Sequence, residues 1–208
     1  RIVREALGSP HVDSRPSGGP ARETIVRLAQ PALAARVADI DHADAILVLG
    51  TDPLHSSPIL DLRIRKAIRR NGAKLVVATD RPTALDGGAE AVARYARGGA
   101  SAFLSELAAA AGTPSERFAE EEGSSPEAPA APPPDDEVPS EEGVPAAAEV
   151  LQGAERVVVI WGERIGRDGA LPALLDLAAA LGLAGQEGSG LLEVPDFANA
   201  RGLREAGC

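Results

Sequence analysis

The segment from Ala43 to Asp80 constrains the fold of this chain more than any other. It holds a continuous apolar run at Ala45–Leu49, a stretch with helical spacing that begins at Pro58, and a second apolar run at Leu75–Ala78. Apolar runs without alternation are typical of strands covered on both faces. The segment therefore predicts a strand–helix–strand unit of a parallel sheet.

The expected helix of this unit has recognisable ends. Ser57 is a good N-cap residue, and Pro58 at the first helical position loses no hydrogen bond. Asn71-Gly72 predicts the end of the helix. Before it, Gly50 ends the first strand and Asp52-Pro53 predicts a turn.

Basic side chains crowd the later turns of this helix. They are Arg63, Arg65, Lys66, Arg69 and Arg70. One interpretation is a solvated face whose last charges complement the helix dipole. The other is a surface that meets an acidic partner protein. The pattern alone favours the first without excluding the second.

Similar elements are expected on both sides of this unit. The sequence predicts helices at 23–30, 32–38, 100–111 and 171–181, strands at 92–95 and 156–161, an extended piece at 191–195 and a turn at 86–88. Such an order of elements is typical of an α/β fold, with a Rossmann-like parallel sheet flanked by helices.

An acidic, Pro-rich stretch interrupts this pattern. Residues 113–145 are rich in Pro, Ala, Glu and Ser with little to bury, and they predict a disordered linker. We expect 1–112 and 146–208 to form one sheet across it, and two separate domains are the lesser alternative. Between Pro114 and Glu149 lie eleven acidic residues and one arginine, so the other residues carry 20 charges of each sign. A neutral folded part gives no reason to expect nucleic acid as a partner.

The composition excludes several kinds of site. The single cysteine, Cys208, excludes an intrachain disulfide and any multi-cysteine metal or cluster site within these residues. No apolar run approaches the roughly 20 residues that span a bilayer, so we expect no direct membrane insertion. The chain begins at Arg1 and has no methionine, which suggests a fragment of a longer protein.

Two loops after predicted strands hold the candidate site residues. They are Gly50, Thr51, Asp52 and Pro53 after the first strand, and Asp80 after the second. Carboxyl ends of parallel strands face the same crevice, where such sheets bind ligands. The alternative is that both aspartates are turn residues, which Asp favours. His55 is a further loop position, but the spacing of the three histidines predicts no metal site and no catalytic arrangement.

The amino-acid sequences of several segments resemble a known family. Ala43–Pro53, continued by Pro58–Ala67, is similar to the large G subunit of bacterial NADH-quinone oxidoreductase, respiratory complex I. Gly188–Pro195 and Asn199–Cys208 resemble its C-terminal part, and Val12–Arg15 an earlier segment. That part of the subunit is similar to molybdopterin-dependent oxidoreductases, in which a Gly-x-x-Pro turn and an Asp after the next strand help to hold a pterin-guanine dinucleotide.

The resemblance implies a scaffold rather than a catalyst. Gly50–Pro53 and Asp80 match the cofactor-holding positions, yet Asp52 stands where Asn is commoner and adds negative charge where phosphates would lie. A vestigial site without molybdopterin and without catalytic residues is therefore expected. The 4Fe-4S and 2Fe-2S clusters of the family lie N-terminal to this region. The partners implied are other complex I subunits, in the peripheral arm on the cytoplasmic side of the bacterial inner membrane.

Two other functions remain open on sequence grounds. The first is part of a molybdopterin-dependent, formate dehydrogenase-like enzyme that keeps its pterin-guanine dinucleotide. The second is a free nucleotide-binding module that uses the Gly50–Pro53 loop and Asp80.

Overall fold

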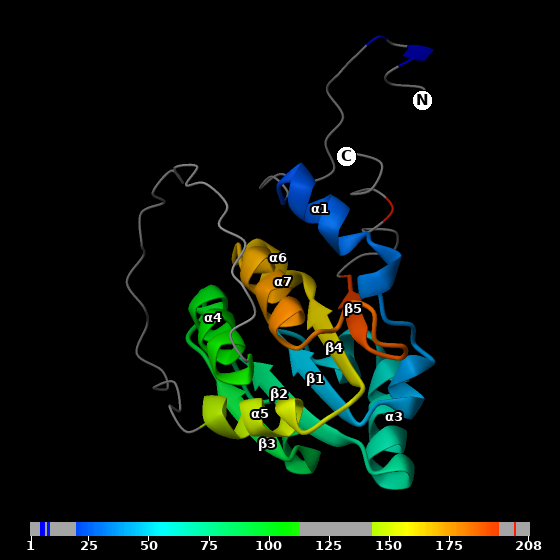
Figure 1. The fold of residues 1–208 in the computed structure, drawn as a ribbon, viewed down its shortest axis with the longest axis vertical. Coiled ribbons are helices and arrows are strands. Elements are labelled where there is room, and N and C mark those ends of the chain that lie inside the picture. Colours follow the sequence, from blue (N-terminus) through cyan, green and yellow to red (C-terminus); the bar gives the residue numbers. More distant parts are fainter. Residues whose placement is uncertain (1–4, 7, 9–19, 113–142, 196–201, 203–208) are drawn as a thin grey trace.

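A computed structural model describes residues 20–112 and 143–195, together with residues 5, 6, 8 and 202. Its centre is a five-stranded sheet in the order β3-β2-β1-β4-β5, in which every neighbouring pair is parallel. The strands are β1 (Ala45–Leu49), β2 (Lys74–Thr79), β3 (Ala91–Arg94), β4 (Val157–Gly162) and β5 (Gly190–Val194). The predicted α/β fold with a parallel sheet is confirmed (Figure 1).

The sheet holds the two halves of the chain together. β1 pairs on one side with β2, and on the other with β4, where Ala45 lies opposite Val157 and Leu49 opposite Trp161. Both neighbours of β1 are buried along most of their length, as expected for strands covered on both faces. The predicted linker lies mostly outside the described residues.

Helices cover the two faces of the sheet separately. Leu47 and Leu49 of β1 point into a core shared with α4 (Ala100–Ala111), α5 (Gly143–Gln152) and α7 (Leu171–Ala180). Ile46 and Val48 point into a second core with α3 (Pro58–Lys66), its continuation η4 (Ala67–Asn71) and η3 (Asp39–His42). The result is a three-layer arrangement, helices–sheet–helices (Figure 1).

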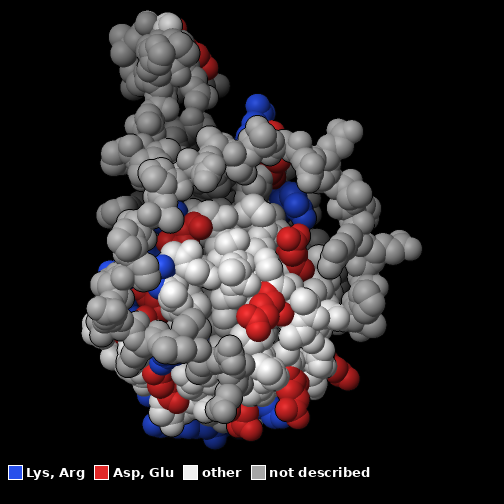
Figure 2. All heavy atoms as spheres, turned by 90° about the vertical axis from the view of Figure 1, so that its left-hand side faces the viewer, with Lys and Arg blue, Asp and Glu red and all other residues white. Residues whose placement is uncertain are grey.

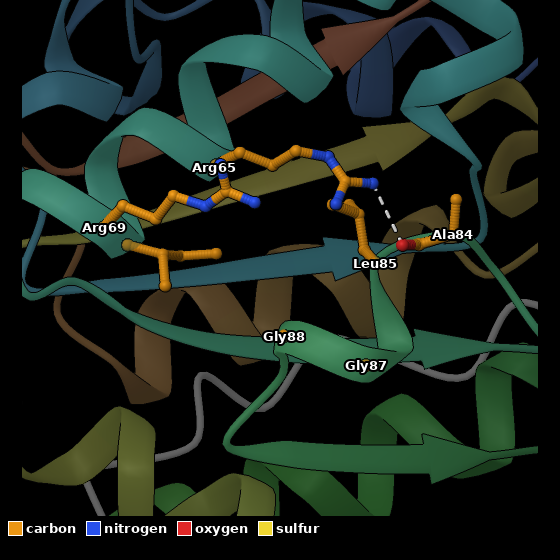
Figure 3. Close-up of a pocket in the computed structure, with 7 residues that line it drawn as sticks. Arg65, Arg69, Ala84, Leu85, Gly87 and Gly88 are labelled. Carbon is orange, nitrogen blue, oxygen red and sulfur yellow. Dashed lines mark hydrogen bonds between the residues drawn. The ribbon is translucent and has the colours of Figure 1, made fainter.

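The two helical layers differ in surface charge. The exposed positions of α4 are mostly alanine and serine, and the side that carries α4 and α5 shows an uncharged area that is broken by isolated acidic side chains and bordered by charged ones (Figure 2). The opposite layer carries the arginines of α3. There, Arg65 Nη2 donates to the Ala84 carbonyl oxygen at 3.0 Å and joins α3 to the loop after β2 (Figure 3).

Most predicted elements are found within two residues of their predicted bounds, but the predicted helix at 32–38 is wrong. A 3₁₀ turn, η2 (Pro31–Leu33), is followed there by extended chain. Ala34 forms a parallel bridge with Leu191, and the Ala35 N–H donates to the Leu191 carbonyl oxygen at 3.0 Å. Pairing with the edge of β5 satisfies these backbone groups and replaces helix.

Other boundaries differ in smaller ways. The predicted turn after Gly50 contains a one-turn helix, α2 (Pro53–Ser56). Ser57 does precede α3, but its side chain makes no capping hydrogen bond. Helix α5 begins at Gly143, inside the range predicted as linker. The predicted N-terminal helix is α1 (Arg22–Leu28), and the turn at 86–88 is the 3₁₀ turn η5 (Asp86–Gly88). No helix in the described ranges is long and apolar enough to cross a membrane.

Candidate functional site

The candidate residues lie at the carboxyl edge of the sheet. Gly50–Pro53 follows β1, Asp80 follows β2, and helix α6 (Glu163–Arg167) follows β4 directly. From β1 the chain continues to β2 and β3 on one side of β1 in the sheet, and then crosses to β4 and β5 on the other side of β1. In doubly wound sheets this change of direction is where ligands bind, so the β1 and β4 ends mark the expected crevice.

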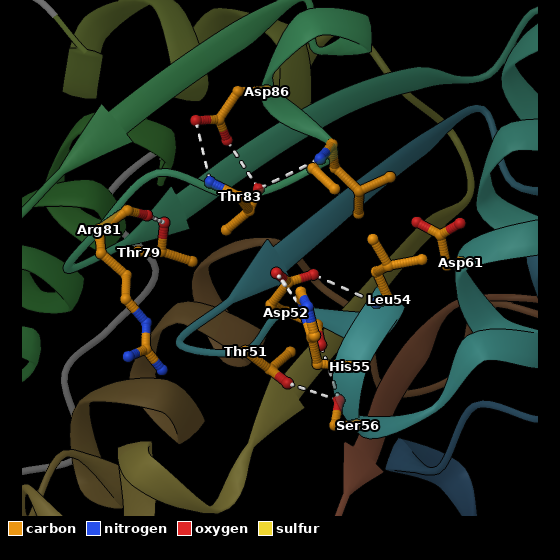
Figure 4. Close-up of polar contacts among 12 residues, drawn as sticks. Thr51, Asp52, Leu54, His55, Ser56, Asp61, Thr79, Arg81, Thr83 and Asp86 are labelled. Carbon is orange, nitrogen blue, oxygen red and sulfur yellow. Dashed lines mark hydrogen bonds and ion pairs between the residues drawn. The ribbon is translucent and has the colours of Figure 1, made fainter.

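Asp52 serves the local backbone. Its Oδ1 accepts a hydrogen bond from the Leu54 N–H at 3.1 Å, which makes it the N-cap of α2. Its Oδ2 lies 2.9 Å from Nδ1 of His55, whose side chain is 80% exposed. Beside them, Thr51 Oγ1 and Ser56 Oγ are 3.3 Å apart (Figure 4). The polar side chains of the loop after β1 therefore contact one another and the backbone of α2, within the same segment of chain.

Asp80 is surrounded by guanidinium groups. Its side chain is only 11% exposed, and Nη1 of Arg164 lies 3.3 Å from Oδ2. Arg97 Nε and Arg81 Nε lie further away, at 3.9 and 4.0 Å. Because Arg164 comes from α6, this contact joins the end of β2 to the end of β4 across β1. No hydrogen bond or ion pair joins Asp52 to Asp80 within the part of the chain that the structure describes.

Gly50 sits under side chains from two other elements. Its φ is +58°, and a Cβ built there would lie 2.6 Å from Cδ1 of Ile165 and 3.1 Å from the Tyr95 hydroxyl oxygen. Ile165 on α6 is fully buried. At the neighbouring strand end, a Cβ on Gly162 would lie 2.7 Å from Cβ of Thr51. Only glycines allow the two strand ends and α6 to pack this closely.

The low exposure of this edge changes its acid–base behaviour. Burial, and after it the charges of Asp80 and Asp168, raise the pKa of Tyr95 well above its usual value. Asp168 is an exposed residue, but partial desolvation of its carboxyl group, followed by the charge of Asp80, also raises its pKa. Part of each shift comes from the Asp80 carboxylate, which lies near both Tyr95 and Asp168. The ionisable groups at this edge therefore interact with one another.

Several of these residues were not singled out from sequence. Arg164, Ile165 and Tyr95 were missed, because their importance depends on β4 and β3 lying beside β1 and β2. The one signal available was that Arg164 and Ile165 directly follow a predicted strand. His11 and Cys208 lie outside the described residues. Among the described residues, no three His, Cys, Asp or Glu side chains are grouped so that they could hold a metal ion.

Comparison with known sequences identifies relatives along the chain. The molybdopterin oxidoreductase family matches residues 14–192. The alpha subunit of an NADPH-Fe(3+) oxidoreductase from Geobacter sulfurreducens is 29% identical over 224 aligned residues, covering 100% of this chain and 26% of that protein. The G subunit of the NADH-quinone oxidoreductase of Mycobacterium tuberculosis is 33% identical over 117 residues, covering 53% of this chain and 14% of that protein. The chain therefore spans about a quarter or less of these relatives.

The loop after β1 does not fit a phosphate of a pterin-guanine dinucleotide, although proteins of this family normally bind pterin cofactors. A phosphate group needs free N–H donors or cations. Here the Leu54 N–H is already bound to Asp52, Gly50 is covered by Ile165, and Arg164 is directed at Asp80. Asp52 adds a carboxylate to the same loop.

A solved structure supports the architecture. A chain of the formyltransferase/hydrolase complex from Methylorubrum extorquens, crystallised with methylofuran, superimposes with a TM-score of 0.52 at 20% sequence identity. The alignment covers 90% of this chain and 48% of that one. At this identity the likeness concerns the fold alone, which agrees with the parallel sheet described above. Since the family match extends over most of the sequence, this chain belongs to the molybdopterin oxidoreductase family.

Proposed function

We propose that this chain is a scaffold part of the large peripheral-arm subunit of an NADH:quinone oxidoreductase. The whole complex would pass electrons from NADH through 4Fe-4S and 2Fe-2S clusters, held by a preceding part of the subunit, to a quinone. The chain itself would contribute structure and contacts with other complex I subunits. Its similarity to the mycobacterial G subunit supports this assignment.

The observation that carries the proposal is the self-contained carboxyl edge of the sheet. Asp52 caps α2, Ile165 covers Gly50, and Arg164 pairs with Asp80. Gly50, Thr51, Asp52, Pro53 and Asp80 are thus interpreted as a vestigial cofactor site whose polar side chains are now bound by neighbouring residues of this chain. A domain with such an edge can keep its fold and its contacts without a ligand, and we assign it no catalytic residues.

The second candidate is a pterin-dependent oxidoreductase of the formate dehydrogenase type. Asp80 favours it, because it lies at the carboxyl end of β2, one strand away from the point between β1 and β4 at which the strand order reverses and such sheets hold ligands. In that case Arg164 and α6 would have to move away from the strand ends to admit a dinucleotide.

The two candidates predict different metal contents of the full-length protein. Purified from its source, the scaffold protein would contain iron without molybdenum, tungsten or the fluorescent oxidised pterin. Stoichiometric molybdenum or tungsten together with pterin would overturn the proposal and assign Gly50–Pro53 and Asp80 to cofactor contacts.

The electron donor and acceptor need a separate test. The Geobacter relative is named for NADPH and ferric iron, whereas the mycobacterial relative is named for NADH and quinone. The purified complex should reduce a quinone with NADH faster than it reduces ferric citrate with NADPH. The opposite preference would reject the quinone assignment, and with it the placement on the cytoplasmic side of the bacterial inner membrane.

A further inference from the structure

A hollow lies between helix α3 and the loop after β2, apart from the carboxyl edge. Its volume is about 310 Å³. Arg65, Ile68 and Arg69 form one side, and Ala84, Leu85, Gly87 and Gly88 form the other. Both arginine side chains extend from the helix over the hollow (Figure 3).

The two arginines differ in their bonding. Arg65 donates to both carboxylate oxygens of Asp61, at 2.8 and 3.1 Å, and also to the Ala84 carbonyl oxygen. Because Asp61 is buried, the Arg65 side chain is held in place at one side of the hollow and its charge is largely neutralised. Arg69 is exposed and has no hydrogen bond or ion pair to any described residue. It supplies an uncompensated cation at the rim.

Other basic residues of the helix do not share this property. Arg63 Nη1 and Lys66 Nζ lie 2.8 and 3.1 Å from Oδ2 of Asp41. Their charges are therefore partly balanced within the chain. Arg70 is exposed like Arg69 but does not line the hollow. The two adjacent arginines thus provide one position at the hollow and one matched position away from it.

The remaining walls are apolar or open. Leu85 is almost fully buried at the base, and Ile68 is half-buried beside it. A Cβ built on Gly87 or Gly88 would meet no atom within 4 Å, so nothing crowds the rim on that side. A ligand whose carboxylate pairs with Arg69 can therefore place its aliphatic carbons against Ile68 and Leu85.

We propose that this hollow receives an aspartate or glutamate side chain from an acidic segment of a neighbouring polypeptide. One free guanidinium matches one carboxylate, because its planar fork can donate two hydrogen bonds to it. A guanidinium can also donate two hydrogen bonds to a phosphate, so the second measurement below separates a polypeptide carboxylate from a small anion. The names of both relatives identify them as subunits, so a second polypeptide is the expected source. Such a neighbour requires no pterin and is compatible with either oxidoreductase.

Carbodiimide cross-linking of the assembled complex tests the proposal. The reagent joins a lysine amine to a carboxylate that already contacts it, and Arg69→Lys keeps the charge while making this position reactive. The full-length subunit with Arg69→Lys should give about fivefold more product with an Asp or Glu of a different subunit than the control Arg70→Lys. Equal yields at the two positions, or products confined to the same subunit, would overturn it.

A second measurement separates a polypeptide from a small anion. Charge reversal in Arg69→Glu should weaken retention of the neighbouring subunit by about threefold to tenfold, and raised salt should reduce the difference. Arg70→Glu should change retention much less. If inorganic phosphate or citrate raises the melting temperature of the unmodified complex but not of Arg69→Glu, and retention is unchanged, the site is for a small anion and the proposal fails.

Discussion

Gly50 shows how much a single backbone position contributes to the closed edge. Replacing it by alanine forces a side chain into a left-handed conformation and places Cβ 2.6 Å from Ile165. We expect Gly50→Ala to lower the free energy of unfolding by about 2 to 4 kcal/mol, from backbone strain and overpacking together. Urea unfolding followed by the fluorescence of Trp161, the single tryptophan, measures this.

The matched control is Gly72→Ala. Gly72 ends η4 with φ +73°, and a Cβ there would meet nothing within 4 Å. Its cost should be the backbone strain alone, about 1 kcal/mol. Equal losses in the two variants would mean that Ile165 does not press on Gly50.

Tyr95, the single tyrosine, reports on burial at the same edge. Its raised pKa means that the folded protein keeps the phenol protonated through pH values where an unfolded chain ionises it. The resulting stability is complete below the ordinary pKa of about 10 and is lost as the pH rises from there toward the raised value. Ultraviolet titration should therefore show no tyrosinate near pH 10 until the protein unfolds. In Tyr95→Phe the loss of stability above pH 10 should be smaller; ordinary titration in the native protein would contradict the burial.

Two side chains of helix α6 contact the strand ends: Arg164 pairs with Asp80, and the buried Ile165 lies on Gly50. Removing the guanidinium in Arg164→Ala should speed amide hydrogen exchange in residues 163–167 by about twofold to fivefold, as expected for a partly exposed ion pair. β4 should exchange as before. Arg97→Ala is the control, because Arg97 is 83% exposed and lies 3.9 Å from Asp80. An equal increase of exchange in both variants would show that the Arg164–Asp80 ion pair does not hold α6 in place.

The elements that were predicted well are those whose signal is local. β1 and α4 have the expected bounds, because a continuous apolar run and an alanine-rich helix ended by Gly112 need no partner to be recognised. The helix predicted at 32–38 is wrong for the opposite reason, because the structure of this segment depends on a distant part of the chain. Its composition suits a helix, but Leu191, distant in sequence, offers Ala34 and Ala35 a strand-like pairing. No local pattern contains that information.

The same distinction applies to the candidate site. That Gly50–Pro53 and Asp80 follow neighbouring strands was readable from the sequence, and the parallel pairing of β1 with β2 confirms it. The alternative role of Asp52 as a turn residue was also readable, and it does cap α2. The closure by Arg164 and Ile165 was not, because it requires β4 to pair with β1 across more than a hundred residues.

At the scale of the whole molecule, one core is built from both sides of the predicted linker. β1 pairs with β4 over five residue pairs, and α4 packs against α5 and α7. Leu104 and Leu107 of α4 share a buried cluster with Leu174 and Leu177 of α7. The continuity of chain between Gly112 and Gly143 is therefore not what holds these layers together.

Separate expression of the two segments tests this arrangement. Residues 1–112 and 143–208, produced together without the intervening residues, should associate in equal amounts, since their shared apolar surface is otherwise exposed to water. Leu104 is fully buried, so Leu104→Asp in the N-terminal segment should abolish association by placing an unpaired charge in the shared core. Ser105→Asp, at the adjacent exposed position, should leave it intact. Recovery of the N-terminal segment alone in every case would indicate two independent domains, whereas loss with Leu104→Asp but not Ser105→Asp would identify one domain built from two segments.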